Sequence, residues 1–222
     1  MAPPEWEFRP GAAPTMTTPE ATTLSTVRRA RRGTLCVCGG VLCTFLDVRA
    51  GGVDLLPDVV GYGLIALGAS ALVPLEAAFR RARLLAWVLA AVSLANLVEV
   101  RWFLAEHGDL TYTYNPLWPA LVLGAVLDIV AFWFLIGGVR RLAVGRCRMV
   151  MARSAEQYRS IYVIASGFRA ALTMFYLHYP QLEFYFGVPV TAFDYLARIL
   201  ILGLLYAAWR QFDDLAPYEV TK

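Results

Sequence analysis

Four ionisable residues lie inside long apolar stretches of this 222-residue chain, and their types could support chemistry. They are Asp128, Arg169, Asp194 and Arg198. Because a charge among apolar side chains is costly, they point to a binding pocket or a proton-linked path, with Asp128 titrating and Arg169 holding a substrate carboxylate or phosphate. They could instead form ion pairs that fix the order and rotation of helices. The sequence favours this structural role by a small margin, since few other polar residues continue a path along these stretches.

Helical spacing predicts how these four charges pair. Asp128 and Arg169 fall near the middles of two apolar segments that run in opposite directions, about 13 Å from the same ends at the helical rise per residue. We therefore expect Asp128 to pair with Arg169. Asp194 and Arg198 are four residues apart, which puts them on one helix face, where they could pair with each other.

Acidic residues also gather between the first two apolar stretches. They are Asp47, Asp54 and Asp58. Three carboxylates facing outward could hold a cation or a basic partner. Local chemistry explains them more simply, because acidic side chains near a helix start interact favourably with the positive end of the helix dipole.

The other reactive residue types lack any motif spacing. The only histidines, His107 and His178, could be joined by Glu106, Asp109 and Glu183, but their spacing resembles no metal site. The four cysteines form no paired ligand set, and the chain has no nucleophile motif and no phosphate-binding glycine loop. We therefore expect no catalytic residue, no metal and no cofactor.

The elements that must position these residues have a very apolar composition. Hydrophobic residues make up 59% of the chain and charged residues 17%, with a mean hydropathy of +0.55. An ordinary soluble domain has about 25% charged residues, so a solvated surface would be hard to build here. This composition argues against a soluble enzyme.

Six apolar segments can be marked along the chain. They are approximately residues 33–48, 57–75, 84–100, 119–139, 161–178 and 189–209. Several are short against the ~20 apolar residues that a transmembrane helix needs. We nevertheless predict an all-α fold, a polytopic integral membrane protein with a bundle of about six transmembrane helices in the plasma membrane.

The positions of the 20 cationic residues support six crossings. Outside the spans, all but Arg49 and Arg101 fall in alternate loops and at the two ends of the chain. The positive-inside rule then places both termini in the cytoplasm. We expect three regions: a disordered cytoplasmic tail over residues 1–27, a six-helix transmembrane domain over 28–210, and a cytoplasmic C-terminal tail over 211–222.

The longest cytoplasmic segment, residues 140–159, interleaves arginines with apolar residues. We expect it to lie along the membrane and to contact anionic lipid through Arg140, Arg141, Arg146 and Arg148. Nucleic acid is not expected as a partner, because no nucleic-acid-binding motif accompanies these charges.

Small residues predict which helices pack closely. Cys36, Gly39, Gly40 and Cys43 share one stripe of the first span, and Gly61, Gly63 and Gly68 give the second span a smooth side. Small residues let helix backbones approach in a bilayer. We expect hairpins of spans one with two and four with five, each joined at its small-residue faces.

The segment between the first two spans, Phe45–Gly63, has the one recognisable signature. Gly51 and Gly52 permit a tight turn there. The segment resembles a pattern in uncharacterised small multi-pass bacterial membrane proteins, with these matching residues: Asp47, Gly52, Asp54, Leu56, Pro57, Asp58, Gly61 and Tyr62. The resemblance covers about 20 residues. It implies a membrane location and a helical hairpin, and it carries over no catalytic residue.

Two classes of function remain. The first is a non-enzymatic membrane component that binds a membrane-protein partner or lipid. The alternative is a small-solute or ion transporter that uses Asp128 and Arg169, which would require a homodimer because six short helices enclose little volume. A water-accessible cavity reaching Asp128 or Arg169 would favour the transporter, and a dry bundle around a direct ion pair would count against it.

Overall fold

The computed structural model describes residues 19–45, 49–50, 53–54, 58–97, 118–176 and 181–213. The described helices are α1 (Pro19–Phe45), α2 (Asp58–Leu72), α3 (Ala78–Leu97), α4 (Trp118–Gly145), α5 (Met149–Tyr176) and α6 (Gln181–Asp213). Two short strands, β1 (Arg49–Ala50) and β2 (Val53–Asp54), pair antiparallel between α1 and α2. The described part is otherwise helical, which confirms the all-α class, and each helix overlaps one of the six predicted apolar segments.

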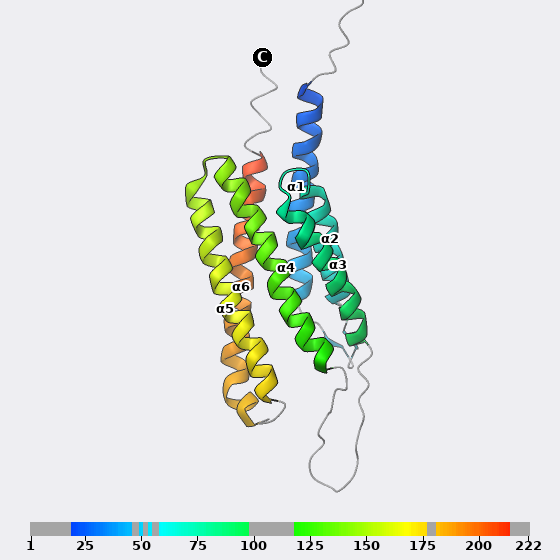
Figure 1. The fold of residues 1–222 in the computed structure, drawn as a ribbon, viewed down its shortest axis with the longest axis vertical. Coiled ribbons are helices and arrows are strands. Elements are labelled where there is room, and N and C mark those ends of the chain that lie inside the picture. The colour runs from blue at the N-terminus through cyan, green and yellow to red at the C-terminus, as the bar shows by residue number, and fades with distance from the viewer. Residues whose placement is uncertain are drawn as a thin grey trace, which may run out of the picture.

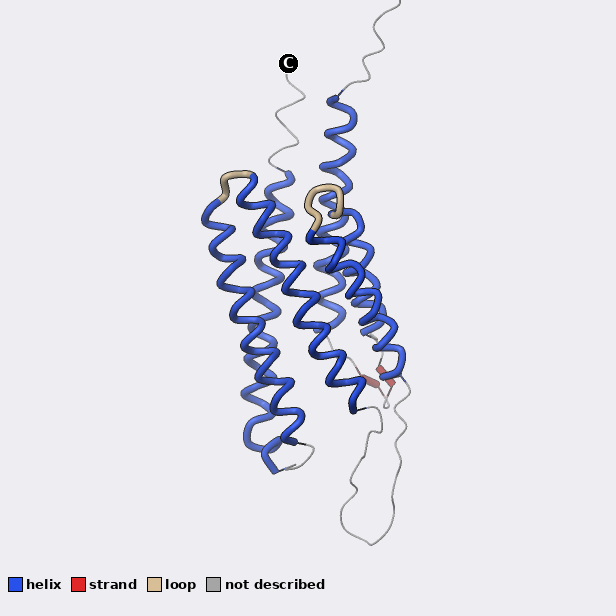
Figure 2. The backbone as a smooth tube through the Cα atoms, viewed as in Figure 1, coloured by secondary structure: helices blue, strands red, loops and turns tan. Residues whose placement is uncertain are grey.

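The helices form a closed ring in chain order. Each packs against the next, and α6 returns to pack against α1. The ribbon shows the helices running roughly along the long axis of the molecule (Figure 1). The α2–α3 and α4–α5 turns lie at one end and the strand pair lies at the other (Figure 2). We call these the arginine-rich end and the hairpin end, because the first also carries Arg28–Arg32 of α1 and Arg210 of α6. Helices α1 with α2 and α4 with α5 pack against each other as predicted, but no described glycine of α4 or α5 makes a close backbone contact with the other helix.

Two of the helices are long and apolar enough to cross a membrane. The stretches are Val122–Gly145 of α4 and Tyr185–Gln211 of α6, with mean hydropathies of 2.3 and 1.7. Helix α2 is apolar but has only 15 residues. Among the described residues, the other helices fall below this standard.

Two helices extend beyond the predicted domain limits. The N-terminal tail was expected to reach Val27, but α1 already begins at Pro19. Adding residues to a formed helix needs no new nucleation, and proline is tolerated in a first turn, so the helix extends beyond its apolar part. Helix α6 likewise continues past residue 210 to Asp213. Residues 1–18 and 214–222 lie outside the described part.

The segment 140–159 does not form a separate stretch along the surface. It is the end of α4, a short turn and the start of α5. Its apolar side continues the core, because Ala143, Ala152 and Ala155 are buried. The arginines of this segment therefore extend from a helical hairpin that belongs to the bundle.

The α4–α5 turn ends α4 with two specific hydrogen bonds. The Arg148 N–H donates to the Ala143 carbonyl at 2.9 Å, and the Cys147 N–H donates to the Val144 carbonyl at 3.0 Å. This is the Schellman pattern, in which the residue after the helix adopts the left-handed conformation that glycine favours. Here that residue is Cys147, with φ 57°.

Replacing Cys147 by glycine is therefore expected to stabilise the protein, by about 1 kcal/mol, because a Cβ in the left-handed region is unfavourable. Thermal unfolding of the purified protein in detergent measures the effect. Cys147→Ala keeps the Cβ and should unfold close to the wild type. A glycine variant no more stable than the alanine variant would show that the turn is not strained at this position.

Glycines allow α1 and α2 to cross closely. A Cβ built on Gly40 would lie 2.5 Å from the Gly61 carbonyl oxygen, and one built on Gly68 would lie 2.6 Å from Val37 Cγ2. The predicted small-residue contact is thus confirmed at Gly40, Gly61 and Gly68. It is wrong at Gly63, where a Cβ would meet nothing within 4 Å, and at Gly39, where a Cβ would meet only Leu64 Cδ1 at 3.9 Å.

Candidate functional site

The centre of the candidate site is the buried carboxylate of Asp128, on α4. Tyr62 on α2 donates its hydroxyl to Oδ1 at 2.8 Å, and Tyr162 on α5 donates its hydroxyl to Oδ2. Arg198 on α6 approaches Oδ2 at 3.3 Å through Nη2. Four helices therefore meet at one carboxylate, and hydrogen bonds to its charged form offset part of the cost of burying it.

A second buried carboxylate, Asp194 on α6, extends this arrangement. Ser166 on α5 donates its hydroxyl to Oδ1 at 2.6 Å, and Arg169 Nη1 donates to Oδ2 at 2.6 Å. Arg198 Nε also donates to Oδ2, at 3.2 Å. Arg198 therefore bridges the two carboxylates, and two guanidinium groups balance two carboxylates. We call the set Tyr62, Asp128, Tyr162, Ser166, Arg169, Asp194 and Arg198 the polar network.

The polar network corrects one predicted ion pair and confirms the other. Asp128 was expected to pair with Arg169, but it pairs with Arg198, and Arg169 pairs with Asp194. The reason is that α6 contacts both α5 and α4, so Asp194 meets Arg169 on α5 while Arg198 reaches Asp128 on α4. The Asp194–Arg198 pair four residues apart is confirmed.

The hydroxyl groups of the polar network were not singled out in the sequence as partners for the charges. A signal was present, because Tyr162, Ser166, Arg169 and Thr173 recur three and four residues apart along α5 and so share one face. When the other faces of a helix are apolar, such a polar stripe indicates the face that contacts polar groups of neighbouring helices.

The polar network borders a cavity of about 270 Å³ in the half of the bundle toward the hairpin end. Asp128, Asp194 and Arg198 contribute to its wall, together with Asp58 at the start of α2 and Ser93 of α3. Arg169 also lines it, with 46% of its side chain exposed. By the same measure one water needs roughly 10–15 Å³, so this cavity has room for several waters or a small solute.

The structure describes two of the three aspartates of the predicted outer carboxylate cluster. Asp58 lines the cavity. Asp54 lies in β2, paired in register with Arg49. Asp47 lies outside the described residues, as do both histidines. Within the described part of the chain, no three histidine, cysteine, aspartate or glutamate residues are grouped to hold a metal ion.

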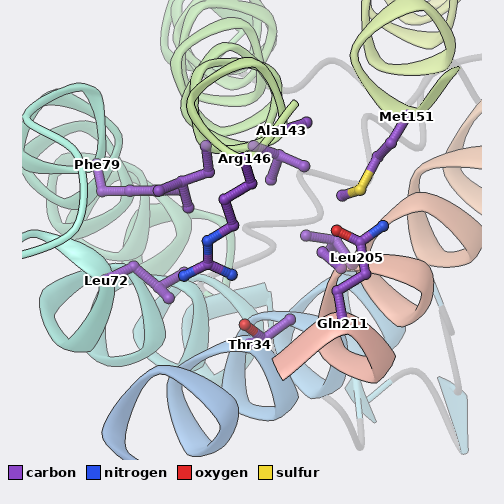
Figure 3. A pocket seen from close by; sticks show the side chains of 11 residues that line it. Thr34, Leu72, Phe79, Ala143, Arg146, Met151, Leu205 and Gln211 are labelled. Carbon is purple, nitrogen blue, oxygen red and sulfur yellow. The ribbon is translucent and has the colours of Figure 1, made fainter. Parts of the chain in front are cut away.

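A second, much smaller cavity lies at the arginine-rich end. Its volume is about 20 Å³, and Figure 3 shows Arg146 extending across it between Leu72 and Gln211. Burial lowers the pKa of the Arg146 guanidinium. A space this size holds about one water, so it is not a site for an organic ligand.

The arginines expected to contact anionic lipid differ in their surroundings. Arg140 Nε lies 3.0 Å from Glu156, and Arg141 Nη1 lies 3.1 Å from Glu76. Arg146 lines the small cavity and Arg148 is exposed. Lipid contact through these residues stays a prediction.

The family resemblance based on the segment around Asp54 also stays a prediction. The chain matches no protein-family model, and neither the curated proteins nor the solved structures contain a significant match to it.

Proposed function

We propose that this chain is a polytopic membrane protein with six spans, both termini in the cytoplasm and a location in the plasma membrane. Two helices meet the length and hydropathy of a membrane span. The others present large apolar side chains at their surface, including Leu67 at 56%, Leu94 at 54% and Ile164 at 64% exposure. Such extensive apolar exposure suits hydrocarbon better than water. The grouping of arginines at one end supports the orientation.

Helix α2 is the shortest of the proposed spans. Its 15 residues extend about 22 Å at the helical rise, against a hydrocarbon core of about 30 Å. The strand pair that precedes it and the turn that follows it would then enter the interface, and a locally thinned bilayer accommodates a short span at modest cost.

Within this membrane protein, we propose that the cavity beside the polar network binds a small solute or ion for transport. One observation carries the proposal: the buried ion network borders a cavity of about 270 Å³ instead of being sealed by apolar side chains. Ion pairs that only fixed helix order would need no such space. This is the feature that separates a transporter from a dry bundle, and it raises the transporter above the partner-binding role that the sequence favours.

The cavity lining indicates the charge of the solute. Three aspartates and two arginines face it: Asp58, Asp128, Asp194, Arg169 and Arg198. Carboxylates outnumber guanidinium groups in this lining, which favours a cation or a zwitterion over an anion. In a zwitterion, the half-exposed Arg169 would hold the carboxylate and Asp58 the ammonium group. The volume lies near the lower end of the usual range of ligand pockets, which limits the solute to a small molecule.

Chemical labelling of an introduced cysteine tests whether the cavity beside the polar network is accessible from outside the cell. Ala170 lines the cavity, whereas Ala165, on the same helix, is fully buried. In a variant whose native cysteines are replaced by serine, Ala170→Cys should react with a membrane-impermeant thiol reagent added outside intact cells, and Ala165→Cys should not. If neither position reacts, or if Ala170→Cys reacts only after permeabilisation, the outward-open site is wrong.

The same labelled position identifies the solute class. Small amines, amino acids and carboxylates are added in turn, and a bound solute should slow the labelling of Ala170→Cys. Asp58→Asn should abolish protection by amines and amino acids, whereas Arg169→Gln should abolish protection by amino acids only. Protection by carboxylates alone, or by no compound in the panel, would contradict the proposed charge preference.

Partner or lipid binding remains the second candidate function. A groove lined by arginines of α1 favours it. This groove is separate from the cavity beside the polar network and from the ion pairs of the α4–α5 hairpin.

A further inference from the structure

A groove at the arginine-rich end combines positive charge with an apolar wall. Its volume is about 350 Å³, and α1 contributes Arg28, Arg29 and Arg32 to it. All three arginines are exposed. The rest of the wall is apolar or small: Gly33 and Cys36 of α1, with Leu67 and Ala71 of α2.

The close crossing of α1 and α2 forms the floor of this groove. A Cβ on Gly33 would lie 2.7 Å from Ala71 Cβ and 2.9 Å from the Gly68 carbonyl oxygen, so the two backbones are almost in contact there. Next to this contact, Leu67 is 56% exposed. The groove is thus a shallow apolar channel beneath three guanidinium groups.

These guanidinium groups differ from several others at the same end of the bundle. Arg140 and Arg141 form ion pairs with glutamates. The Cζ atom of Arg31 lies 4.7 Å from the centroid of the Trp209 ring. The Cζ atom of Arg81 lies 5.2 Å from the centroid of the Phe134 ring. No ion pair joins Arg28, Arg29 or Arg32 to a carboxylate among the residues that the structure describes, and no acidic side chain lines the groove. Three adjacent cations with no counter-charge in their own groove favour the binding of an anion there.

We propose that this groove binds an anionic phospholipid of the cytoplasmic leaflet. The phosphate accepts hydrogen bonds from the three guanidinium groups, which offer planar pairs of donors. An acyl chain then lies over Leu67, Ala71 and Cys36, toward the bilayer centre. The apolar wall is what selects a lipid over a free anion, because a small anion gains nothing from it. The inference rests on the proposed membrane location, and it is independent of the solute cavity.

Binding of a fluorescent phosphatidylglycerol to the full-length protein in detergent micelles tests the site. Arg28→Gln/Arg29→Gln/Arg32→Gln should weaken binding about tenfold or more, since each cation near an anionic surface contributes appreciably. The matched control is Arg80→Gln/Arg81→Gln/Arg83→Gln, which removes three charges from α3 at the same end and should change binding less than threefold. Equal weakening by the two triple variants would overturn the proposal, because general charge would then explain binding.

Further binding measurements distinguish a phospholipid site from a site for free phosphate. Leu67→Asn, at an exposed position, should weaken phosphatidylglycerol binding several-fold. Inorganic phosphate should not displace the lipid at equimolar concentration, and phosphatidylcholine should bind at least tenfold more weakly. A wild-type protein that binds both lipids equally, or that releases phosphatidylglycerol to equimolar phosphate, would contradict a lipid site. Failure of the cavity labelling experiment would leave these results unaffected.

Discussion

Replacing Arg198 by methionine is expected to lower the free energy of unfolding by about 3–5 kcal/mol, the usual cost of removing one partner from a buried ion pair. Arg198 touches both buried carboxylates, at 3.3 Å from Asp128 and 3.2 Å from Asp194. Without it, Asp128 keeps two tyrosine hydroxyls but no cation, and Asp194 keeps only Arg169 as a cation. Denaturant titration of the protein in mixed micelles, followed by circular dichroism, measures the loss.

A second substitution shows whether charge balance causes this loss. Arg198→Met/Asp128→Asn leaves Asp194 paired with Arg169 and removes the unbalanced carboxylate, so it should recover a large part of the lost stability. Arg141→Met is the control, because Arg141 is 62% exposed and pairs only with Glu76. Such surface pairs are worth about 1 kcal/mol or less. If Arg198→Met costs no more than Arg141→Met, the network does not hold the helices together.

The features that depend on local pattern could be predicted from the sequence. Apolar stretches located the helices, arginines indicated which ends of the helices lie together, and the glycines of α1 and α2 predicted a close crossing. Asp194 and Arg198 are neighbours on one helix, so their pairing followed from the helical repeat alone. In each case the relevant partners lie on one element or on two consecutive ones.

The features that depend on ring closure could not be predicted. Asp128 and Arg198 are 70 residues apart, and their contact exists because α6 packs back toward α1 and lies beside α5. The same closure brings Tyr62 and Tyr162 to one carboxylate from opposite sides of the ring. The sequence singled out the four charged residues of the polar network as candidates, and only the three-dimensional arrangement assigned their partners and revealed the cavity.

Gly40→Ala is expected to be a strongly disruptive single-methyl change, lowering the free energy of unfolding by about 2 kcal/mol or more. The added Cβ would lie 2.5 Å from the Gly61 carbonyl oxygen and 2.8 Å from the Ile65 backbone nitrogen. Backbone atoms cannot rotate away as a side chain does, so α1 and α2 must separate. The expected gain from alanine's higher helix propensity, at most about 1 kcal/mol, does not offset this.

The adjacent residue provides the control, because a Cβ on Gly39 would meet only Leu64 Cδ1, at an ordinary 3.9 Å. Gly39→Ala should therefore be neutral or slightly stabilising when thermal unfolding of both alanine variants is measured in detergent. The crossing also supports the polar network, since Thr44 of α1 contacts Arg198 at 3.4 Å and Tyr62 follows Gly61 on α2. Gly40→Ala should consequently change the labelling rate of Ala170→Cys, whereas Gly39→Ala should not. Equal stability of the two alanine variants would show that α1 and α2 are not held in the close contact on which both the cavity and the arginine groove depend.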